Sequence, residues 1–170
     1  MNIREERIED YPAVYALIKE AFATAEHSDG NEQDLVVALR SNKEAFLPAL
    51  SLVAEQEGEI VGHILFTKAK VADDDVLVLA PLSVKPSCQR QGIGQALIQE
   101  GHRVAQEKGF RYSVVLGSAD YYPKMGYVPA VNFGIQTPEG IPPENFMAIA
   151  LQSNAPRLNG PITYAKEFGL

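Results

Sequence analysis

The segment from residue 76 to residue 108 constrains the fold more than any other part of the chain. Residues 76–84 are apolar on both faces of an extended chain, which predicts a buried strand. A helical pattern follows at residues 92–108, and the polar residues 85–91 join the two elements. Because proline cannot donate to a sheet ladder, Pro81 predicts a bulge or a splayed edge inside the strand.

The rest of the chain places hairpins before this segment and one strand–helix–strand unit around it. We expect strands at residues 3–7, 50–54, 60–67, 76–84, 112–116, 146–151 and 162–164, and helices at 11–23, 31–41, 92–108 and 119–125. Asp10 is the expected N-cap of the first helix. This order predicts an α+β fold, a mixed sheet with helices on both faces, and not a doubly wound parallel sheet. We expect a single domain over residues 1–170, with a core of about 1–152 and a C-terminal extension at 153–170.

Composition excludes several classes of function. The 170 residues include 15 Lys and Arg against 22 Asp and Glu, so a net charge of −7 argues against general nucleic-acid binding. No apolar run approaches the roughly 18 residues of a membrane span, and the first residues do not resemble a targeting signal. We therefore expect a cytoplasmic protein with no membrane partner. Cys88 is the single cysteine, and no cluster has metal-ligand spacing, so we expect neither a disulfide nor a metal.

The start of the predicted helix at residues 92–108 has the properties of an anion site. A helix N-terminus offers unpaired N–H groups and the positive end of the helix dipole. Gly92 and Gly94 would let a phosphate approach the backbone closely. Residues 85–111 hold five basic and two acidic residues in an otherwise acidic chain. Rival phosphate motifs fit worse, because there is no Gly-Lys-Ser/Thr and the third glycine of a dinucleotide fold is missing.

Two motifs resemble those of a known family. Residues 89–94, QRQGIG, resemble the Gln/Arg-x-x-Gly-x-Gly/Ala signature of the GNAT superfamily of N-acetyltransferases. Residues 122–127, YPKMGY, resemble the Tyr-x-x-x-Gly-Phe/Tyr segment of the same family. A looser similarity to the bacterial YhbS-like subgroup rests on residues 62–64, 82–84, 121–122 and 164–168. The superfamily resemblance covers about residues 1–150.

This resemblance implies the GNAT acyl-CoA N-acyltransferase fold and an enzyme. Acetyl-CoA would lie between strands 76–84 and 112–116, and its acetyl group would pass to a primary amine by direct attack in a ternary complex. Backbone groups of Leu82 and Val84 would pair with the pantetheine arm of the cofactor. The N–H groups of residues 90–96 would hold its pyrophosphate. The N–H groups near residues 82–84 would polarise the thioester carbonyl. The implied cofactor-binding residues are Leu82, Ser83, Val84, Gln89, Arg90, Gln91, Gly92, Ile93, Gly94, Gln95, Ala96, Tyr121 and Lys124.

The resemblance also implies a general acid. Tyr122 occupies the position of the acid tyrosine of the family, and an ordinary tyrosine, with a pKa of about 10, is protonated at neutral pH. The base is left open. The strand at 76–84 has no glutamate, and the candidates are Glu32, His63 and Ser83, acting through water. Relatives often lack a single essential base.

The acceptor carries no motif. Residues 1–34 hold nine acidic and three basic residues, which suggests a cationic amine, although a generic acidic surface explains the same excess. The sequence is compatible with either a small amine or a protein amine as the acceptor. It is also compatible with either a monomer or a homodimer. Two alternative functions remain: a non-catalytic acyl-CoA-binding or sensing module, and a protein- or peptide-acetylating partner of a larger complex.

Overall fold

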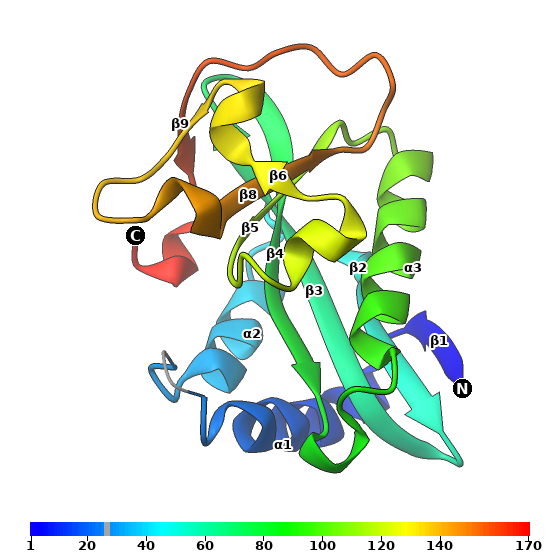
Figure 1. The fold of residues 1–170 in the computed structure, drawn as a ribbon. Helices are drawn as coiled ribbons and strands as arrows, with labels where there is room; N and C mark the ends of the chain where they lie inside the picture. Colours follow the sequence, from blue (N-terminus) through cyan, green and yellow to red (C-terminus); the bar gives the residue numbers. More distant parts are fainter. Residues whose placement is uncertain (26–27) are drawn as a thin grey trace.

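A central mixed sheet separates two layers of helices (Figure 1). The computed structural model describes residues 1–25 and 28–170. Its strands are β1 (Asn2–Glu5), β2 (Phe46–Gln56), β3 (Glu59–Val71), β4 (Asp74–Val84), β5 (Tyr112–Leu116), β6 (Val128–Pro129), β7 (Ile135–Gln136), β8 (Phe146–Ala150) and β9 (Gly160–Thr163). Its α-helices are α1 (Tyr11–Phe22), α2 (Glu32–Arg40) and α3 (Ile93–Glu107).

The strand order is β1-β2-β3-β4-β5-β8-β6, and β9 pairs with both β3 and β7. The pairs β4–β5 and β7–β9 are parallel, whereas the other pairs are antiparallel. A doubly wound sheet would pair most of its strands in parallel. The predicted mixed sheet is therefore confirmed.

Helices cover both faces of this sheet, as the sequence predicts. On one face, Val14 and Ile18 of α1 and Val36 of α2 pack against Val53 and Leu65. On the other face, α3 packs its apolar side against β2, β3 and β4. Burial of apolar area at about 25 cal/mol per Å² holds both layers in place.

The predicted bulge in β4 is present. Ile64 of β3 pairs with Leu82, and Phe66 pairs with Leu79, so β4 has one residue more than β3 between these pairs. β4 and β5 are paired at Leu77 and Val78 alone, and β4 continues to residue 84. The two strands therefore part beyond this point, and β4 runs on toward the N-terminus of α3 (Figure 1).

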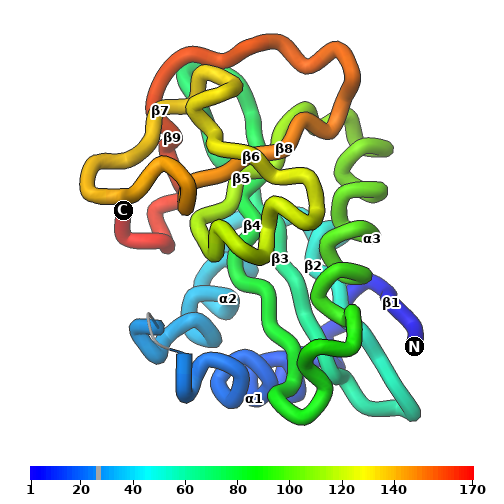
Figure 2. Tube along the Cα trace, in the orientation of Figure 1, coloured from blue at the N-terminus to red at the C-terminus, as the bar shows by residue number. Residues whose placement is uncertain are grey.

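Residues 153–170 share the core of the rest of the chain. β9 pairs with Lys70 and Val71 of β3, beyond the last pairing of β2 with β3 at Thr67. Leu158 is buried, and the Asn42 side chain donates to the Glu167 carboxylate at 2.8 Å. Figure 2 shows this segment crossing the top of the molecule after β8 before it returns to the sheet.

The structure differs from the prediction at residues 119–145. The expected helix at 119–125 begins three residues later and is a single 3-10 turn, η3 (Tyr122–Met125); Gly126, with a left-handed φ of +96°, ends it at the predicted residue. Between residues 127 and 146, where we expected no strand or helix, the structure contains the two-residue strands β6 and β7. None of the helices within residues 1–25 and 28–170 has the length and apolar content to cross a membrane.

Asp10 does not cap α1 with its side chain, although it occupies the N-cap position. Its carboxylate instead accepts a bidentate pair of hydrogen bonds from Arg4, at 2.7 and 3.0 Å, and one from the Arg7 N–H at 2.7 Å. The Arg4 guanidinium and the Arg7 N–H lower the pKa of Asp10. The ion pair thus ties β1 to the start of α1.

We expect Asp10→Asn to lower the free energy of unfolding by about 2 kcal/mol at pH 7, because a largely buried Arg4 would lose its bidentate charged partner and keep only Glu55, at 3.2 Å. Since the folded-state pKa of Asp10 is lowered, its contribution is complete above the unfolded pKa of about 3.9 and is lost as the pH falls through the folded value. Urea unfolding of both proteins across this pH range measures the difference. Asp120→Asn, at an exposed site without an ion pair among the described residues, is the control. An equal loss in both variants would contradict the expectation.

Candidate functional site

The two glycines before and inside α3 are required for different reasons. Gly92, the N-cap residue, has φ +84°, and an added Cβ would have no neighbour within 4 Å. Its role is therefore conformational. Gly94 has ordinary helical geometry, but an added Cβ would lie 2.4 Å from the hydroxyl oxygen of Tyr121. Its role is to leave space for that phenol.

The loop before α3 forms a cradle of free N–H groups. Arg90, with φ +64°, and Gly92 both take left-handed conformations, which turn successive N–H groups toward one side. In the described part of the chain, no hydrogen bond uses the N–H groups of residues 90–95. The N–H of Ala96 donates to the carbonyl of Gly92 at 3.0 Å and so belongs to the helix. The expected run of donors, residues 90–96, therefore ends at Gln95.

The side chains of this loop divide into two groups. The amide of Gln89 donates to the Val84 carbonyl at 3.1 Å and ties the loop to the end of β4. Arg90 and Gln91 are exposed, and Arg90 forms no ion pair with any residue that the structure describes. The cradle therefore has a free cation beside its N–H groups, as an anion site requires.

The end of β4 presents its backbone to the gap beside β5. Ser83 lies directly opposite His63, and the N–H of Lys85 donates to the Val61 carbonyl at 2.8 Å. Because bonded and non-bonded pairs alternate in an antiparallel ladder, Leu82 and Val84 direct their N–H and C=O groups away from β3. Ser83 directs its own toward β3, and it is 2% exposed. Of the three expected strand residues, Ser83 is thus turned away from the gap.

Three tyrosines that follow β5 in the chain pack against one another. The rings of Tyr121 and Tyr122 meet edge to face with centroids 5.1 Å apart, and Tyr122 meets Tyr127 in the same way at 5.8 Å. Gly117 leaves the space for Tyr122, since an added Cβ would lie 2.5 Å from its ring. Burial raises the pKa of Tyr122 above its ordinary value, so the phenol stays protonated at neutral pH.

Tyr127 is anchored by residues that the sequence analysis did not single out. Its hydroxyl lies 2.8 Å from the Ser113 hydroxyl and 2.9 Å from Nε2 of His102. Burial lowers the pKa of His102 to about 4, so this imidazole is neutral at physiological pH. The contact joins α3 to β5 in the core, and no local pattern in the sequence indicates it.

His63 lies in a buried polar cluster with Glu6, Arg40 and Ser51. Its Nε2 is 3.1 Å from the Ser51 hydroxyl, which donates to Glu6 at 2.9 Å, and Arg40 pairs with Glu6 at 2.6 Å. His63 is fully buried, and desolvation, aided by the Arg40 charge, lowers its pKa to about 3. This imidazole is a poor acceptor for the proton of an ammonium group.

The other predicted residues lie apart from this cluster. Glu32 begins α2 and is half-buried, and its carboxylate accepts a hydrogen bond from the Ser28 hydroxyl. Lys124 is exposed on η3. Two acids of the N-terminal excess, Glu6 and Asp10, are neutralised by internal arginines, and Glu26 lies outside the described residues.

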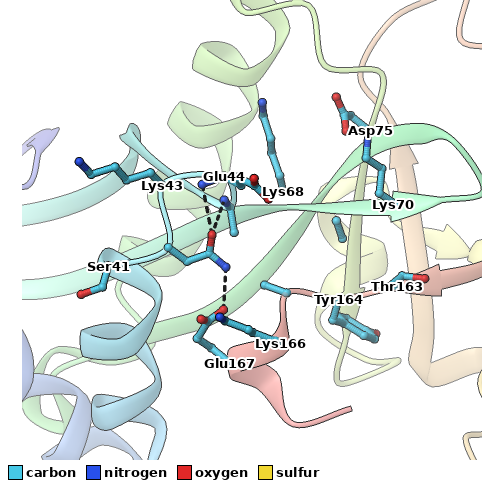
Figure 3. Close-up of a pocket in the computed structure, with 14 residues that line it drawn as sticks. Ser41, Lys43, Glu44, Lys68, Lys70, Asp75, Thr163, Tyr164, Lys166 and Glu167 are labelled. Atoms are coloured by element: carbon cyan, nitrogen blue, oxygen red, sulfur yellow. Dashed lines mark hydrogen bonds and ion pairs between the residues drawn. The ribbon is translucent and has the colours of Figure 1, made fainter.

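A separate groove of about 1080 Å³ lies between the end of α2, β3 and the C-terminal segment (Figure 3). It is lined by Ser41, Asn42, Lys43, Glu44, Ala45, Lys68, Ala69, Lys70, Asp75, Thr163, Tyr164, Ala165, Lys166 and Glu167. Lys70 pairs with Asp75 at 2.6 Å, and charges of both signs line the wall. None of the predicted site residues lies in this groove. Within the described residues, no group of three His, Cys, Asp or Glu side chains could hold a metal ion.

Comparison with known proteins agrees with this geometry. The acetyltransferase (GNAT) family model matches residues 4–127. The Escherichia coli (strain K12) protein named uncharacterized N-acetyltransferase YjhQ is 43% identical over 127 residues, which cover 72% of this chain and 70% of the relative.

Two solved structures share the fold over almost the whole chain. A GNAT family acetyltransferase from Brucella melitensis, in complex with acetyl-CoA, is 31% identical with a TM-score of 0.81, covering 98% of this chain and 97% of that one. YhbS from Escherichia coli, in complex with CoA, is 28% identical with a TM-score of 0.87, covering 99% and 92%. The mixed α+β sheet, the glycine-rich cradle and these matches together show that the chain belongs to the acetyltransferase (GNAT) family.

Proposed function

We propose that this protein transfers the acetyl group of acetyl-CoA to a primary amine. The observation that carries the proposal is the run of free N–H groups at residues 90–95, placed where β4 and β5 part. A diphosphate fits such a cradle because backbone donors, the helix dipole and Arg90 all favour negative charge there. The relatives solved with acetyl-CoA and CoA support the same ligand.

The parting between β4 and β5 suits the rest of the cofactor. The outward N–H and C=O groups of Leu82 and Val84 would pair with the amides of the pantetheine arm as an added strand does. A free N–H in this stretch would also donate to the thioester oxygen, where negative charge develops during the reaction. The proposed binding set is therefore Leu82, Val84, Arg90, Gln91, Gly92, Ile93, Gly94, Gln95, Tyr121 and Lys124, with Gln89 holding the loop.

Tyr122 is the proposed general acid. When a neutral amine attacks the thioester carbon, the new C–N bond replaces the C–S bond and the sulfur departs with the electron pair. The Tyr122 phenol, kept protonated by burial, donates a proton to that sulfur, and the proton that the nitrogen loses as the amide forms restores the phenol through water. The ring contact with Tyr127, itself held by Ser113 and His102, fixes the direction of the phenol.

Glu32 is the proposed base, because it is half-buried whereas the other two candidates, His63 and Ser83, are buried. His63 is closed off from solvent and has a pKa of about 3, so it suits a structural role under α1. Glu32 is half-buried on the first turn of α2, and its carboxylate would take the proton of the ammonium group through water.

We expect Gly92→Glu to abolish acetyl-CoA binding, because it places a side chain and a negative charge at the cradle. Gly109→Glu is the matched control: Gly109 follows the other end of α3 with φ +85°, and an added Cβ there also meets nothing within 4 Å. Calorimetric titration of acetyl-CoA into each protein measures the effect. Equal affinity of the Gly92→Glu variant and the wild type would contradict the cradle assignment.

We expect Tyr122→Phe to lower kcat about 100-fold and to leave the affinity for acetyl-CoA unchanged, since the variant loses the acid and keeps the ring. CoA release with a panel of small primary amines and lysine peptides measures turnover, and the preferred class shows whether the acceptor is small or peptidic. Tyr164→Phe, which removes another half-buried phenol outside the site, is the control. Acetyl-CoA binding without turnover of any amine by the wild type would favour the sensing module instead.

The pH dependence follows from the direction of the Tyr122 shift. Because burial raises its pKa above the ordinary value of about 10, the acid stays protonated between about pH 6 and pH 9. kcat/KM should therefore rise with pH as the amine loses its proton, with no alkaline decline in this range. A decline below pH 9 in the wild type that is absent from Tyr122→Phe would show that the acid titrates there.

A further inference from the structure

The helix α2 depends on its neighbours for its position. It has nine residues, Glu32–Arg40, and an isolated helix of this length is not stable in water. Its inner face buries Val36 and Leu39 in a cluster shared with α1, β2 and β3. The contacts of α2 with other elements therefore decide where its first residue, Glu32, lies.

One of these elements belongs to the C-terminal segment. The 3-10 turn η6 (Lys166–Phe168) follows β9 and packs against α2 (Figure 1). The half-buried ring of Phe168 packs against the cluster that contains Val36 and Leu39. It also packs against a second cluster on the sheet, which includes Val71 of β3. A single aromatic side chain therefore links α2 to the sheet.

A side-chain amide joins the end of α2 to the same turn. The Asn42 side chain donates to the Glu167 carboxylate at 2.8 Å (Figure 3). Its oxygen accepts hydrogen bonds from the N–H groups of Glu44 and Ala45, at 3.2 and 3.3 Å. This one side chain thus holds η6 and the turn between α2 and β2 together.

The segment before η6 is attached to the sheet. β9 pairs with the end of β3 and with β7. The Tyr112 hydroxyl of β5 donates to the Pro156 carbonyl at 2.7 Å, and the rings of Tyr164 and Phe168 pack with centroids 5.5 Å apart. The sheet therefore sets the position of η6, and η6 can act as a support for α2.

We propose that Phe168 and Glu167 position α2, and through it Glu32, for the reaction with the amine. The proposal rests on the proposed function, because it takes Glu32 as the base. α2 is about 13 Å long, so a helix that loses support near its last turn can pivot and carry its first turn away. Misplacement by about 1 Å can lower a rate about 100-fold. Phe168 and Glu167 act through α2 and are thus positioning residues.

The proposed cofactor side should be insensitive to this support. The cradle and the end of β4 pack on a different cluster, which contains Ile93 and Leu97 of α3. Loss of the Phe168 ring should therefore change the reaction with the amine and leave acetyl-CoA binding as it is.

Phe168→Ala should lower kcat/KM for the amine about tenfold, with the Kd of acetyl-CoA unchanged in calorimetry. The probe is the primary amine or lysine peptide that the wild type acetylates fastest. Hydrogen exchange, followed by mass spectrometry, should become faster at the amides of α2 and stay the same at those of α3. Phe168→Leu, which keeps most of the apolar contact, should restore both properties. Glu167→Ala should have a smaller effect in the same direction, because the hydrogen bond that it removes is only partly buried.

Phe133→Ala is the matched control. Phe133 is also half-buried, and it packs on the same sheet cluster and on the ring of Tyr112, with centroids 5.0 Å apart. Its loss should leave hydrogen exchange in α2 unchanged. A double-mutant cycle with Glu32→Gln tests whether the effect passes through the base. In that background Phe168→Ala should lower kcat/KM almost no further.

The outcomes separate this proposal from the proposed function. Unchanged exchange in α2, an equal loss of acetyl-CoA affinity in Phe168→Ala, or additive effects with Glu32→Gln would overturn the positioning role alone. Failure of the wild type to bind acetyl-CoA, or to acetylate any amine, would overturn the proposed function and the positioning role with it.

Discussion

The early end of pairing between β4 and β5 is the constraint on which the rest of the site depends. The two parallel strands share their ladder at Leu77 and Val78, and the extra residue near Pro81 then turns β4 away. A parting inside a sheet would normally leave backbone groups without partners, which is costly unless something else pairs with them. The same parting brings the end of β4 to the cradle before α3 and leaves room for the tyrosines that follow β5. The proposed cofactor site and the proposed acid position thus both depend on one irregularity of the sheet.

The sequence predicted a feature accurately where the physical cause of that feature lies within one short segment. The strand at residues 112–116 and the helix around 93–107 follow from apolar periodicity, and the structure has them with almost the predicted bounds. The bulge follows from the missing N–H of Pro81. The 3-10 turn at 122–125 was predicted to begin at residue 119, because the pattern shows the stop at Gly126 and does not show where so short an element begins. Family motifs located the cradle, but they could not show that Ser83 faces β3.

Contacts between distant segments lay beyond the sequence pattern. Tyr127 binds Ser113 and His102, which are 14 and 25 residues away. This cluster forms because α3 lies close to β5 in the folded chain, and the sequence of one segment alone does not indicate that packing. The same applies to Glu6 and Arg40, whose buried pair fixes β1 to the end of α2 and removes one of the N-terminal acids from the surface. The acidic excess of that region is accordingly weaker evidence for a cationic acceptor than its count suggests.

The two glycines of the signature are required for two different physical reasons. At Gly92 the backbone conformation, with φ +84°, strains any residue that has a Cβ, whatever its surroundings. At Gly94 the backbone would accept alanine, and the excluded volume belongs to the hydroxyl of Tyr121, 27 residues further along the chain. The signature permits alanine at this second position, and that substitution is compatible with a ring that carries no hydroxyl. The glycine at 94 is therefore best understood together with the tyrosine at 121, as two halves of one contact across the gap.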